Sequence, residues 1–199
     1  TVGVLADFVR SRVPDLPLVV DPVMISTSGH PLLAPEAVSV CLRDLFPLAR
    51  LITPNVPEAE WLSGRSIETF EQQDGVAVAL ARDWGCAVLL KGGHLSGEAR
   101  DVLAVPDGVI SEHRHARVDG VNTHGTGCTL ASAIAGFLAH GLSLETAVQK
   151  GCRYVHEGLV HAGFWGRGFC QISHGDAAKE IFLSNEPDSG LIFSPAGAR

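Results

Sequence analysis

Short apolar runs alternate with longer segments of helical periodicity along most of this chain. The runs contain three or four residues and no Pro, which is typical of strands buried on both faces of a parallel sheet. The longer segments have apolar residues three and four positions apart, which is typical of amphipathic helices. The expected strands are 18–20, 51–53 and 87–90, the expected hairpin is 101–105 with 109–118, and the expected helices are 2–13, 34–45, 54–62, 67–84, 128–139 and 143–159. This alternation predicts an α/β fold with a mostly parallel central sheet.

The length suits one globular domain with a core of its own. The chain has 199 residues, of which 46% are hydrophobic and 19% are charged. We expect a single domain over residues 1–184 and a mobile tail over residues 185–199, where Pro, Ser and Gly are frequent. The sequence begins at Thr1 rather than Met and opens directly on a helical pattern, so we expect it to start within a domain.

Charge and cysteine content narrow the class of protein. A net charge of −7 without a basic cluster argues against a nucleic-acid-binding surface. The five cysteines are odd in number and contain no CxxC pair, so neither a disulfide framework nor a structural zinc site is expected. No apolar run approaches the roughly 18 residues that cross a bilayer, and no export signal is recognisable. We therefore expect a cytoplasmic protein that binds neither nucleic acid nor membrane.

Two groups of histidines deserve a test as metal ligands. His156, Glu157 and His161 approach an HExxH motif, but the second histidine comes one residue late, so the two side chains point about 140° apart on a helix. His113 and His115 lie on one face of an expected strand without a third ligand close in sequence, and we interpret them as surface residues. Zinc binding is not predicted.

The segment 121–141 joins a glycine-rich loop to an apolar helix. The first N–H groups of a helix lack intrahelical partners and carry the positive end of its dipole, and Gly125 and Gly127 allow the backbone to approach a ligand closely. Such a junction is typical of phosphate binding. It is not a Walker A loop, because Thr126 and Gly127 stand where Lys and Ser or Thr are required. It is not a dinucleotide fingerprint, because Leu130 stands at the third glycine position. An ordinary glycine-rich helix start explains the loop equally well.

Cys128 lies in the first turn of this expected helix. A helix N-terminus favours the reactive thiolate form of cysteine, although a small buried cysteine is the plainer interpretation. The sequence HGTGCTLASAIA, which begins at His124, resembles the phosphate-loop motif of the hydroxymethylpyrimidine/phosphomethylpyrimidine kinases of thiamine biosynthesis, in the ribokinase-like superfamily. Most superfamily members have Asp as general base at the position of Cys128. The cysteine therefore points to the pyrimidine kinases and to a similar subset of vitamin B6 kinases.

Polar residues follow all three expected strands. Asp21 and Lys91 come directly after apolar runs, and ligands of open parallel sheets collect beyond the carboxyl ends of the strands. Asn55 precedes Glu58 by three residues, the spacing of a helix N-cap and its capping-box partner. A solvated turn aspartate, an exposed lysine and a purely structural cap are the alternatives. The segments VVDPVM, TPNVPEAEWL and VLLKGGH resemble three further segments of the same kinase family.

The resemblance implies a role for each candidate residue. Asp21 and Glu58 would hold Mg²⁺ largely through water, with Asn55 in support. Lys91 would contact the transferred phosphate, and Cys128 would take the proton of the acceptor hydroxyl. The remaining candidates are Gly125, Thr126 and Gly127, whose N–H groups would form the anion hole, and Asn122 and Thr123, which with Lys91 would bind ATP.

The same resemblance implies the reaction. We expect phosphate transfer from Mg-ATP to 4-amino-5-hydroxymethyl-2-methylpyrimidine, then to its monophosphate, by a ribokinase-like three-layer α/β kinase. Family members carry a substrate-contacting segment ahead of the helix that matches 2–13, so we expect an N-terminally truncated domain. A pyridoxal or pyridoxine kinase and an inactive nucleotide-binding fragment remain alternatives. Superfamily members often dimerise, so the resemblance is compatible with a homodimer.

Overall fold

The computed structural model of this protein describes residues 1–25, 30–93, 99–108, 110–118, 124–163 and 171–182. These residues form two compact units that divide between Glu112 and His113. The predicted tail, 185–199, lies outside the described residues, and the prediction of one domain over 1–184 stays a prediction. No helix in the described ranges is both long and apolar enough to cross a membrane.

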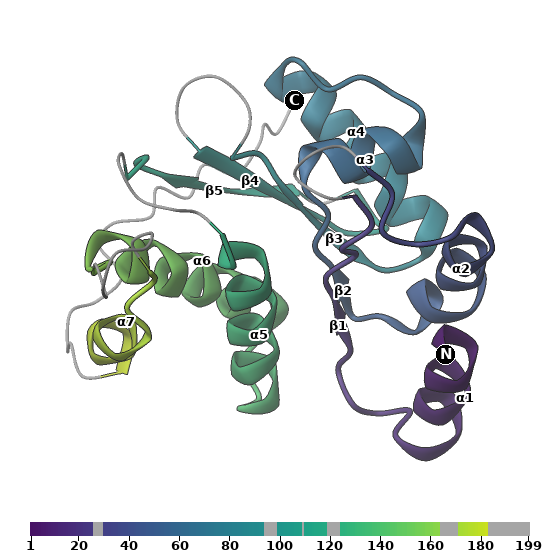
Figure 1. Ribbon diagram of the computed structural model, residues 1–199, viewed down its shortest axis with the longest axis horizontal. Coiled ribbons are helices and arrows are strands. Elements are labelled where there is room, and N and C mark those ends of the chain that lie inside the picture. The colour runs from purple at the N-terminus through teal and green to yellow at the C-terminus, as the bar shows by residue number, and fades with distance from the viewer. Residues whose placement is uncertain (26–29, 94–98, 109, 119–123, 164–170, 183–199) are drawn as a thin grey trace. The chain divides into compact units, whose positions relative to one another are not determined.

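A mixed sheet forms the framework of the first unit (Figure 1). Two pairs of strands, β1 with β2 and β2 with β3, are parallel, whereas β4 runs antiparallel to β3. The order of the strands follows the sequence, and β5 continues across the boundary between the units. The strands are β1 (Val19–Val20), β2 (Leu51–Ile52), β3 (Ala87–Lys91), β4 (Ala99–Ala104) and β5 (Ile110–His115). The predicted α/β fold and all five predicted strands are confirmed.

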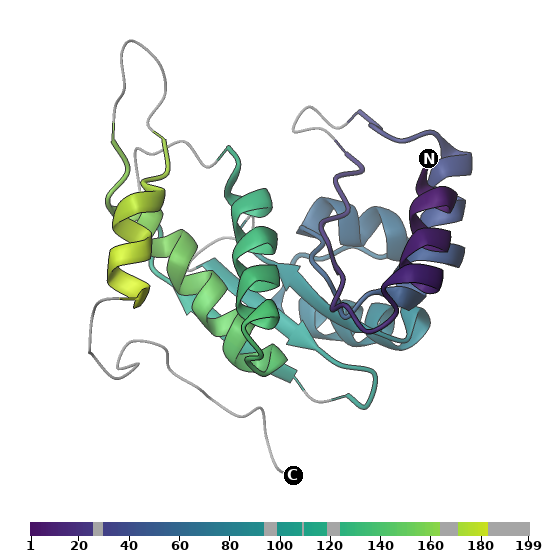
Figure 2. The same ribbon diagram turned by 90° about the horizontal axis from the view of Figure 1, so that it is seen from below.

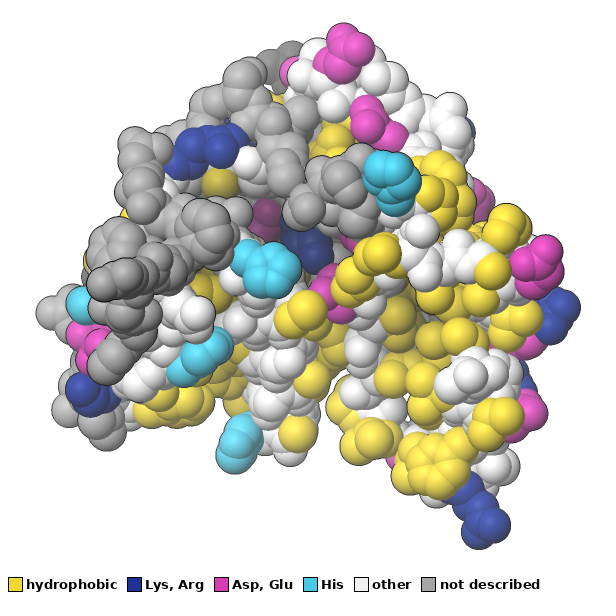
Figure 3. Space-filling view, in the orientation of Figure 1, with side chains coloured by type: hydrophobic (Ala, Val, Ile, Leu, Met, Phe, Trp, Pro, Cys, Tyr) yellow, Lys and Arg dark blue, Asp and Glu magenta, His cyan; other side chains and the backbone are white. Residues whose placement is uncertain are grey.

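Helix α4 covers the middle of this sheet with the apolar face that its sequence predicts. Val76, Ala77 and Leu80 of this helix are buried in one cluster with Val88 and Leu90 of β3. Full burial of side chains of this size contributes roughly 1.5–3 kcal/mol for each Val or Leu. The helices of the unit are α1 (Val2–Arg12), α2 (Pro35–Val40), α3 (Val56–Ser63) and α4 (Phe70–Trp84). Hydrophobic side chains are also gathered over the surface that α1 and α2 occupy (Figure 3).

Two helices of the first unit differ from their predicted bounds for local reasons. The helix expected over 34–45 is α-helical only in α2, continues as a π-helical turn (Cys41–Leu45) and ends in a short 3₁₀ helix (Phe46–Leu48). Pro47 has no N–H to donate to the carbonyl of Arg43, so the α-helical hydrogen bonds cannot continue through this position. Helix α4 begins three residues later than expected because Thr69 and Gln72 form a capping box.

Three helices dominate the second unit: α5 (Thr126–Ala139), α6 (Leu144–Val160) and α7 (His174–Phe182). Helices α5 and α6 lie side by side in both ribbon views (Figures 1 and 2) and are joined through Gly141, which has a φ of +82°. Ser143 caps α6 by accepting the N–H of Thr146. The helices predicted over 128–139 and 143–159 are confirmed, and α5 begins two residues earlier than expected.

The prediction that His113 lies on the surface is wrong. Its side chain is only 1% exposed, whereas Arg114, on the opposite face of β5, is exposed. His113 and His115 do share one face of the strand, but that face is the buried one. Burial, with a smaller contribution from His115, lowers the pKa of His113 to about 4. The residue is therefore neutral at physiological pH.

Candidate active site

Asp21, Thr53 and Lys91 meet where three neighbouring strands end. The Lys91 ammonium lies 2.9 Å from Asp21 Oδ1, and the Thr53 hydroxyl donates to the same oxygen at 3.1 Å. Backbone hydrogen bonds between neighbouring strands continue as far as these residues. Thr53 N donates to the carbonyl of Val20, and Lys91 N donates to the carbonyl of Pro54. The Lys91 and Asp21 side chains are 16% and 14% exposed. The strand-end rule therefore correctly predicted that Asp21 and Lys91 lie together.

Glu58 lies beside this pair at the start of α3. The capping box is complete: Asn55 Oδ1 accepts the N–H of Glu58, and Glu58 Oε2 accepts the N–H of Asn55, both at 2.9 Å. The other carboxyl oxygen accepts the N–H of Met24 at 3.3 Å. Burial raises the pKa of Glu58, although these two N–H groups and the charge of Lys91 oppose the shift. The predicted cap is confirmed, and carboxylate oxygens are the ligands that Mg²⁺ prefers.

Other candidate residues lie in the second unit, at the N-terminus of α5. Gly125 is the N-cap of α5 and has a φ of +86°, a conformation that side chains other than glycine rarely adopt. The first hydrogen bond across this boundary runs from Thr129 N to the carbonyl of Gly125 at 3.0 Å. Thr126, Gly127 and Cys128 form the first turn, where N–H groups suit an anion. The Cys128 side chain is exposed.

Two of the predicted ATP-binding residues, Asn122 and Thr123, lie outside the described residues. The remaining candidates fall into a first group in the first unit, around Lys91, and a second group in the second unit, at the start of α5. Their catalytic roles stay predictions.

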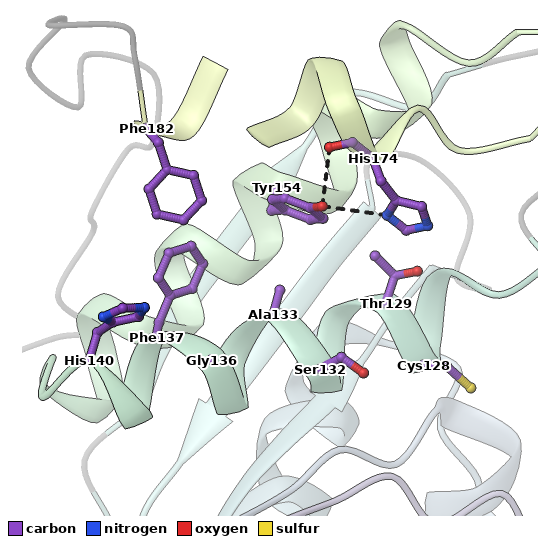
Figure 4. A pocket seen from close by; sticks show the side chains of 10 residues that line it. All are labelled: Cys128, Thr129, Ser132, Ala133, Gly136, Phe137, His140, Tyr154, His174 and Phe182. Carbon is purple, nitrogen blue, oxygen red and sulfur yellow. Dashed lines mark hydrogen bonds between the residues drawn. The ribbon is translucent and has the colours of Figure 1, made fainter. Parts of the chain in front are cut away.

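A groove that the sequence did not predict runs along α5 (Figure 4). It has a volume of about 520 Å³ and lies within the second unit. Cys128 is at one end, and Phe137 and His140 are at the other (Figure 4). Tyr154 of α6 lines the groove, and its hydroxyl donates a hydrogen bond to the carbonyl of His174 at 3.2 Å. The lining residues are Cys128, Thr129, Ser132, Ala133, Gly136, Phe137, His140, Tyr154, His174 and Phe182.

The groove was missed because α7, which supplies part of its wall, was not predicted. A sequence signal for this helix does exist: Ser173 precedes Asp176 by three residues, as in a capping box, and their side chains are hydrogen-bonded at 2.7 Å. The helix has only nine residues, and its apolar positions, Ala177, Ala178, Ile181 and Phe182, lie in its last six, so the helical pattern is short.

Solved structures similar to this one include kinases. The pyridoxal kinase of Staphylococcus aureus superposes with a TM-score of 0.77 at 25% identity, covering 88% of this chain and 63% of that one. A phosphomethylpyrimidine kinase from Clostridium difficile superposes with a TM-score of 0.63 at 38% identity, covering 76% of this chain and 60% of that one. The fold is therefore that of the ribokinase-like kinases.

Sequence comparison identifies the family within this class. The phosphomethylpyrimidine kinase family matches residues 1–173, and this chain belongs to that family. The hydroxymethylpyrimidine/phosphomethylpyrimidine kinase of Rhizobium meliloti is 42% identical over 145 residues, which are 72% of this chain and 54% of that protein. The thiamine biosynthesis bifunctional protein ThiED of Geobacter sulfurreducens is 45% identical over 167 residues, 82% of this chain and 34% of that protein. The family predicted from the motifs is confirmed, and this chain spans only part of the length of either relative.

Proposed function

We propose that this protein transfers the γ-phosphate of ATP to 4-amino-5-hydroxymethyl-2-methylpyrimidine and then to the resulting monophosphate. The observation that carries the proposal is the Lys91–Asp21 pair at the strand ends, 2.9 Å apart and largely buried, in a chain of the phosphomethylpyrimidine kinase family. A buried ammonium that is already directed by a carboxylate is suited to neutralise a phosphoryl group. Curated relatives with this activity in their names are 42% identical to the chain.

The reaction requires little covalent work from the protein. The acceptor hydroxyl oxygen attacks the γ-phosphorus, the bond from that phosphorus to the β,γ-bridging oxygen breaks, and ADP leaves with the electron pair. Cys128 takes the hydroxyl proton, and the N–H groups of Gly125, Thr126 and Gly127 hold the γ-phosphoryl oxygens. Lys91 neutralises the charge that develops on them.

Mg²⁺ fits the carboxylates of the first unit. Asp21 and Glu58 offer oxygen ligands near enough for their charges to interact, and the oxygens of Glu58 already accept two backbone N–H groups. This favours a role for Glu58 through water rather than by direct coordination. When bound with ATP, Mg²⁺ would offset the charge of the β- and γ-phosphates. The resident Lys91–Asp21 pair would then exchange partners, the lysine with phosphate and the carboxylate with the metal.

The groove along α5 is suited to bind the nucleoside part of ATP. It begins at the helix turn proposed to bind phosphate and continues to Phe137, nine residues further on, which is about 13 Å along a helix. The rings of Phe137, Tyr154 and Phe182 line it, and such surfaces suit a flat heterocycle. We therefore assign nucleotide binding to this groove within the proposed function.

A pyridoxal kinase activity is the second candidate. The pyridoxal kinase of Staphylococcus aureus superposes on more of this chain than the Clostridium difficile phosphomethylpyrimidine kinase does, 88% against 76%. Sequence identity favours the pyrimidine kinase, at 38% against 25%.

Parallel acceptor assays distinguish the candidates. ADP release by the chain with Mg-ATP would be measured with hydroxymethylpyrimidine, its monophosphate and pyridoxal, and each product would be identified by mass. Turnover of the two pyrimidines supports the proposal, and turnover of pyridoxal alone supports the second candidate. ATP binding without ADP release on any acceptor would contradict both.

A further inference from the structure

A buried amide from α4 holds the end of β3 at which Lys91 lies. Gln73 is completely buried, and its Nε2 donates to two backbone carbonyls, that of Leu90 at 3.2 Å and that of Arg100 at 3.0 Å. Leu90 is the residue before Lys91 in β3, and Arg100 lies near the start of β4. One side chain therefore ties the strand that carries the lysine to its antiparallel neighbour.

The backbone after Lys91 is fitted closely around this amide. Gly92 is buried, and its N–H donates to Asp101 Oδ1 at 3.0 Å. A Cβ at this position would overlap the carbonyl oxygen of Arg100 and would come within 2.5 Å of Gln73 Nε2. The absence of a side chain at Gly92 thus permits the contact between the amide and both strands.

The Arg100 guanidinium fixes which way the Gln73 amide faces. Arg100 Nη1 donates to Gln73 Oε1 at 3.0 Å, so the amide must turn its NH₂ group toward the two carbonyls. Asp74 and Glu112 lie 2.7 Å and 2.6 Å from Arg100 Nη2 and balance its charge. Burial disfavours the charged guanidinium, yet these two carboxylates outweigh it and raise the pKa of Arg100. The orientation of the amide is therefore set by a side chain that stays charged.

We propose that Gln73 is a positioning residue for the phosphate-binding lysine, acting through the backbone of Leu90–Gly92. This inference rests on the proposed function. Lys91 N donates to the carbonyl of Pro54, which holds β3 on the side of β2. The Gln73 amide holds β3 on its other side, by binding the carbonyls of Leu90 and of Arg100 in β4. An apolar side chain at position 73 would leave Arg100 Nη1 and the two carbonyls without this partner, so the amide also contributes to stability. The hydrogen bonds of Gln73 fix the position of the backbone that carries Lys91. Misplacement of a catalytic group by about 1 Å can lower the rate about 100-fold.

A double-mutant cycle tests whether Gln73 acts through Lys91. Gln73→Met has similar length and no amide, and it would be made both in the wild-type chain and in Lys91→Met. We expect a roughly 10- to 100-fold loss of kcat in the presence of Lys91, with a smaller change in KM for the acceptor. In the Lys91→Met background the same substitution should have no further effect on kcat, while the melting temperature falls equally in both backgrounds.

Two further variants separate positioning from folding. Val76→Ala removes buried volume from the same face of α4 and serves as the matched control, since it should lower stability without lowering kcat. Gln73→Leu also removes the amide donors, without turning a carboxylate toward the two carbonyls or adding a charge beside Asp74 and Glu112, and it should show the same kcat loss. Unchanged kcat in both Gln73 variants, or an equal loss in the Lys91→Met background, would overturn the inference.

A binding readout keeps this test independent of turnover. A wild-type chain that binds Mg-ATP but transfers no phosphate would contradict the proposed function. The cycle would then be measured by calorimetry, and Gln73→Met should weaken Mg-ATP binding only when Lys91 is present. Equal affinities of the wild-type and Gln73→Met chains would overturn the positioning role, as would loss of affinity that does not depend on Lys91.

Discussion

The two groups of candidate residues are prepared for a phosphate in opposite ways. In the first unit, Lys91 and Asp21 are largely buried charges that satisfy each other, and Thr53 completes the cluster. In the second unit, the start of α5 offers backbone N–H groups next to the exposed thiol of Cys128. A buried ammonium needs a partner before its ligand arrives, because an unpaired buried charge costs several kcal/mol. Backbone N–H groups carry no net charge, so those at the start of α5 need no charged partner before an anion binds.

The largest effect should come from the second group. Cys128→Ala removes the proposed base, and the first transfer, to an alcohol, should slow by about 10²–10⁴. The second transfer has a phosphate as acceptor, which is already an anion, and should slow far less. Single-turnover rates with the two acceptors measure this ratio, and Cys152→Ala, at a buried cysteine of the same unit, is the matched control. Equal losses in both transfers would contradict the role of Cys128 as base.

The first group should matter to both transfers alike. Lys91→Met removes the charge and keeps the length of the side chain, so kcat should fall by about 10²–10³ with either acceptor. Lys179→Met, at an exposed lysine of α7, should leave the rate within about twofold. A Lys91→Met chain with nearly wild-type kcat would show that the resident Lys91–Asp21 pair is only structural.

A smaller effect, on the affinity for ATP, is expected from a substitution in the groove along α5. Ser132 is exposed and lines the groove, so Ser132→Trp should fill the space without disturbing the core. If the groove holds the nucleoside, the affinity for ATP should fall by about tenfold or more, equivalent to about 1.4 kcal/mol. Thr146→Trp, on α6 outside the groove, is the control. Unchanged ATP affinity in Ser132→Trp, measured by calorimetry, would remove nucleotide binding from this groove.

An effect on stability, rather than on activity or affinity, is expected in the second unit. His113 has a pKa of about 4 in the folded chain and about 6.5 when unfolded, so the unfolded chain binds more protons between these values. Its contribution is present above pH 6.5 and is lost as the pH falls toward 4. From pH 7.5 to pH 5 the free energy of unfolding should drop by about 2 kcal/mol on this account.

Urea unfolding at the two pH values measures this loss. Between pH 7.5 and pH 5 the free energy of unfolding of His113→Leu should fall by about 2 kcal/mol less than that of the wild-type chain. His140→Gln, at an exposed histidine, should behave like the wild-type chain. An equal pH dependence in His113→Leu would show that burial of His113 does not destabilise its charged form.

Much of the first group could be predicted from sequence because simple rules act there. Apolar runs fixed β2 and β3, strand ends brought Asp21 and Lys91 together, and the spacing of Asn55 and Glu58 predicted a cap that the structure contains. Gln73 escaped notice because a single glutamine in an amphipathic helix gives no sign that its amide is buried.

The second group was predictable only at its start. Glycines and the apolar run predicted α5, but α7 has only nine residues and a correspondingly short helical pattern, and the groove depends on it. The burial of His113 was missed because alternation along β5 shows which residues share a face and not which face is covered. Side-chain contacts between distant segments, such as that of Tyr154 with His174, follow from packing rather than from local pattern.

A time course of phosphorylated products tests the central claim most directly. The chain would be mixed with Mg-ATP and hydroxymethylpyrimidine, and the products would be resolved by mass as ADP accumulates. The account predicts that the pyrimidine monophosphate appears first and the diphosphate follows, with one ADP released for each phosphate transferred. ADP release without any phosphorylated pyrimidine, or ATP binding without ADP release, would contradict it.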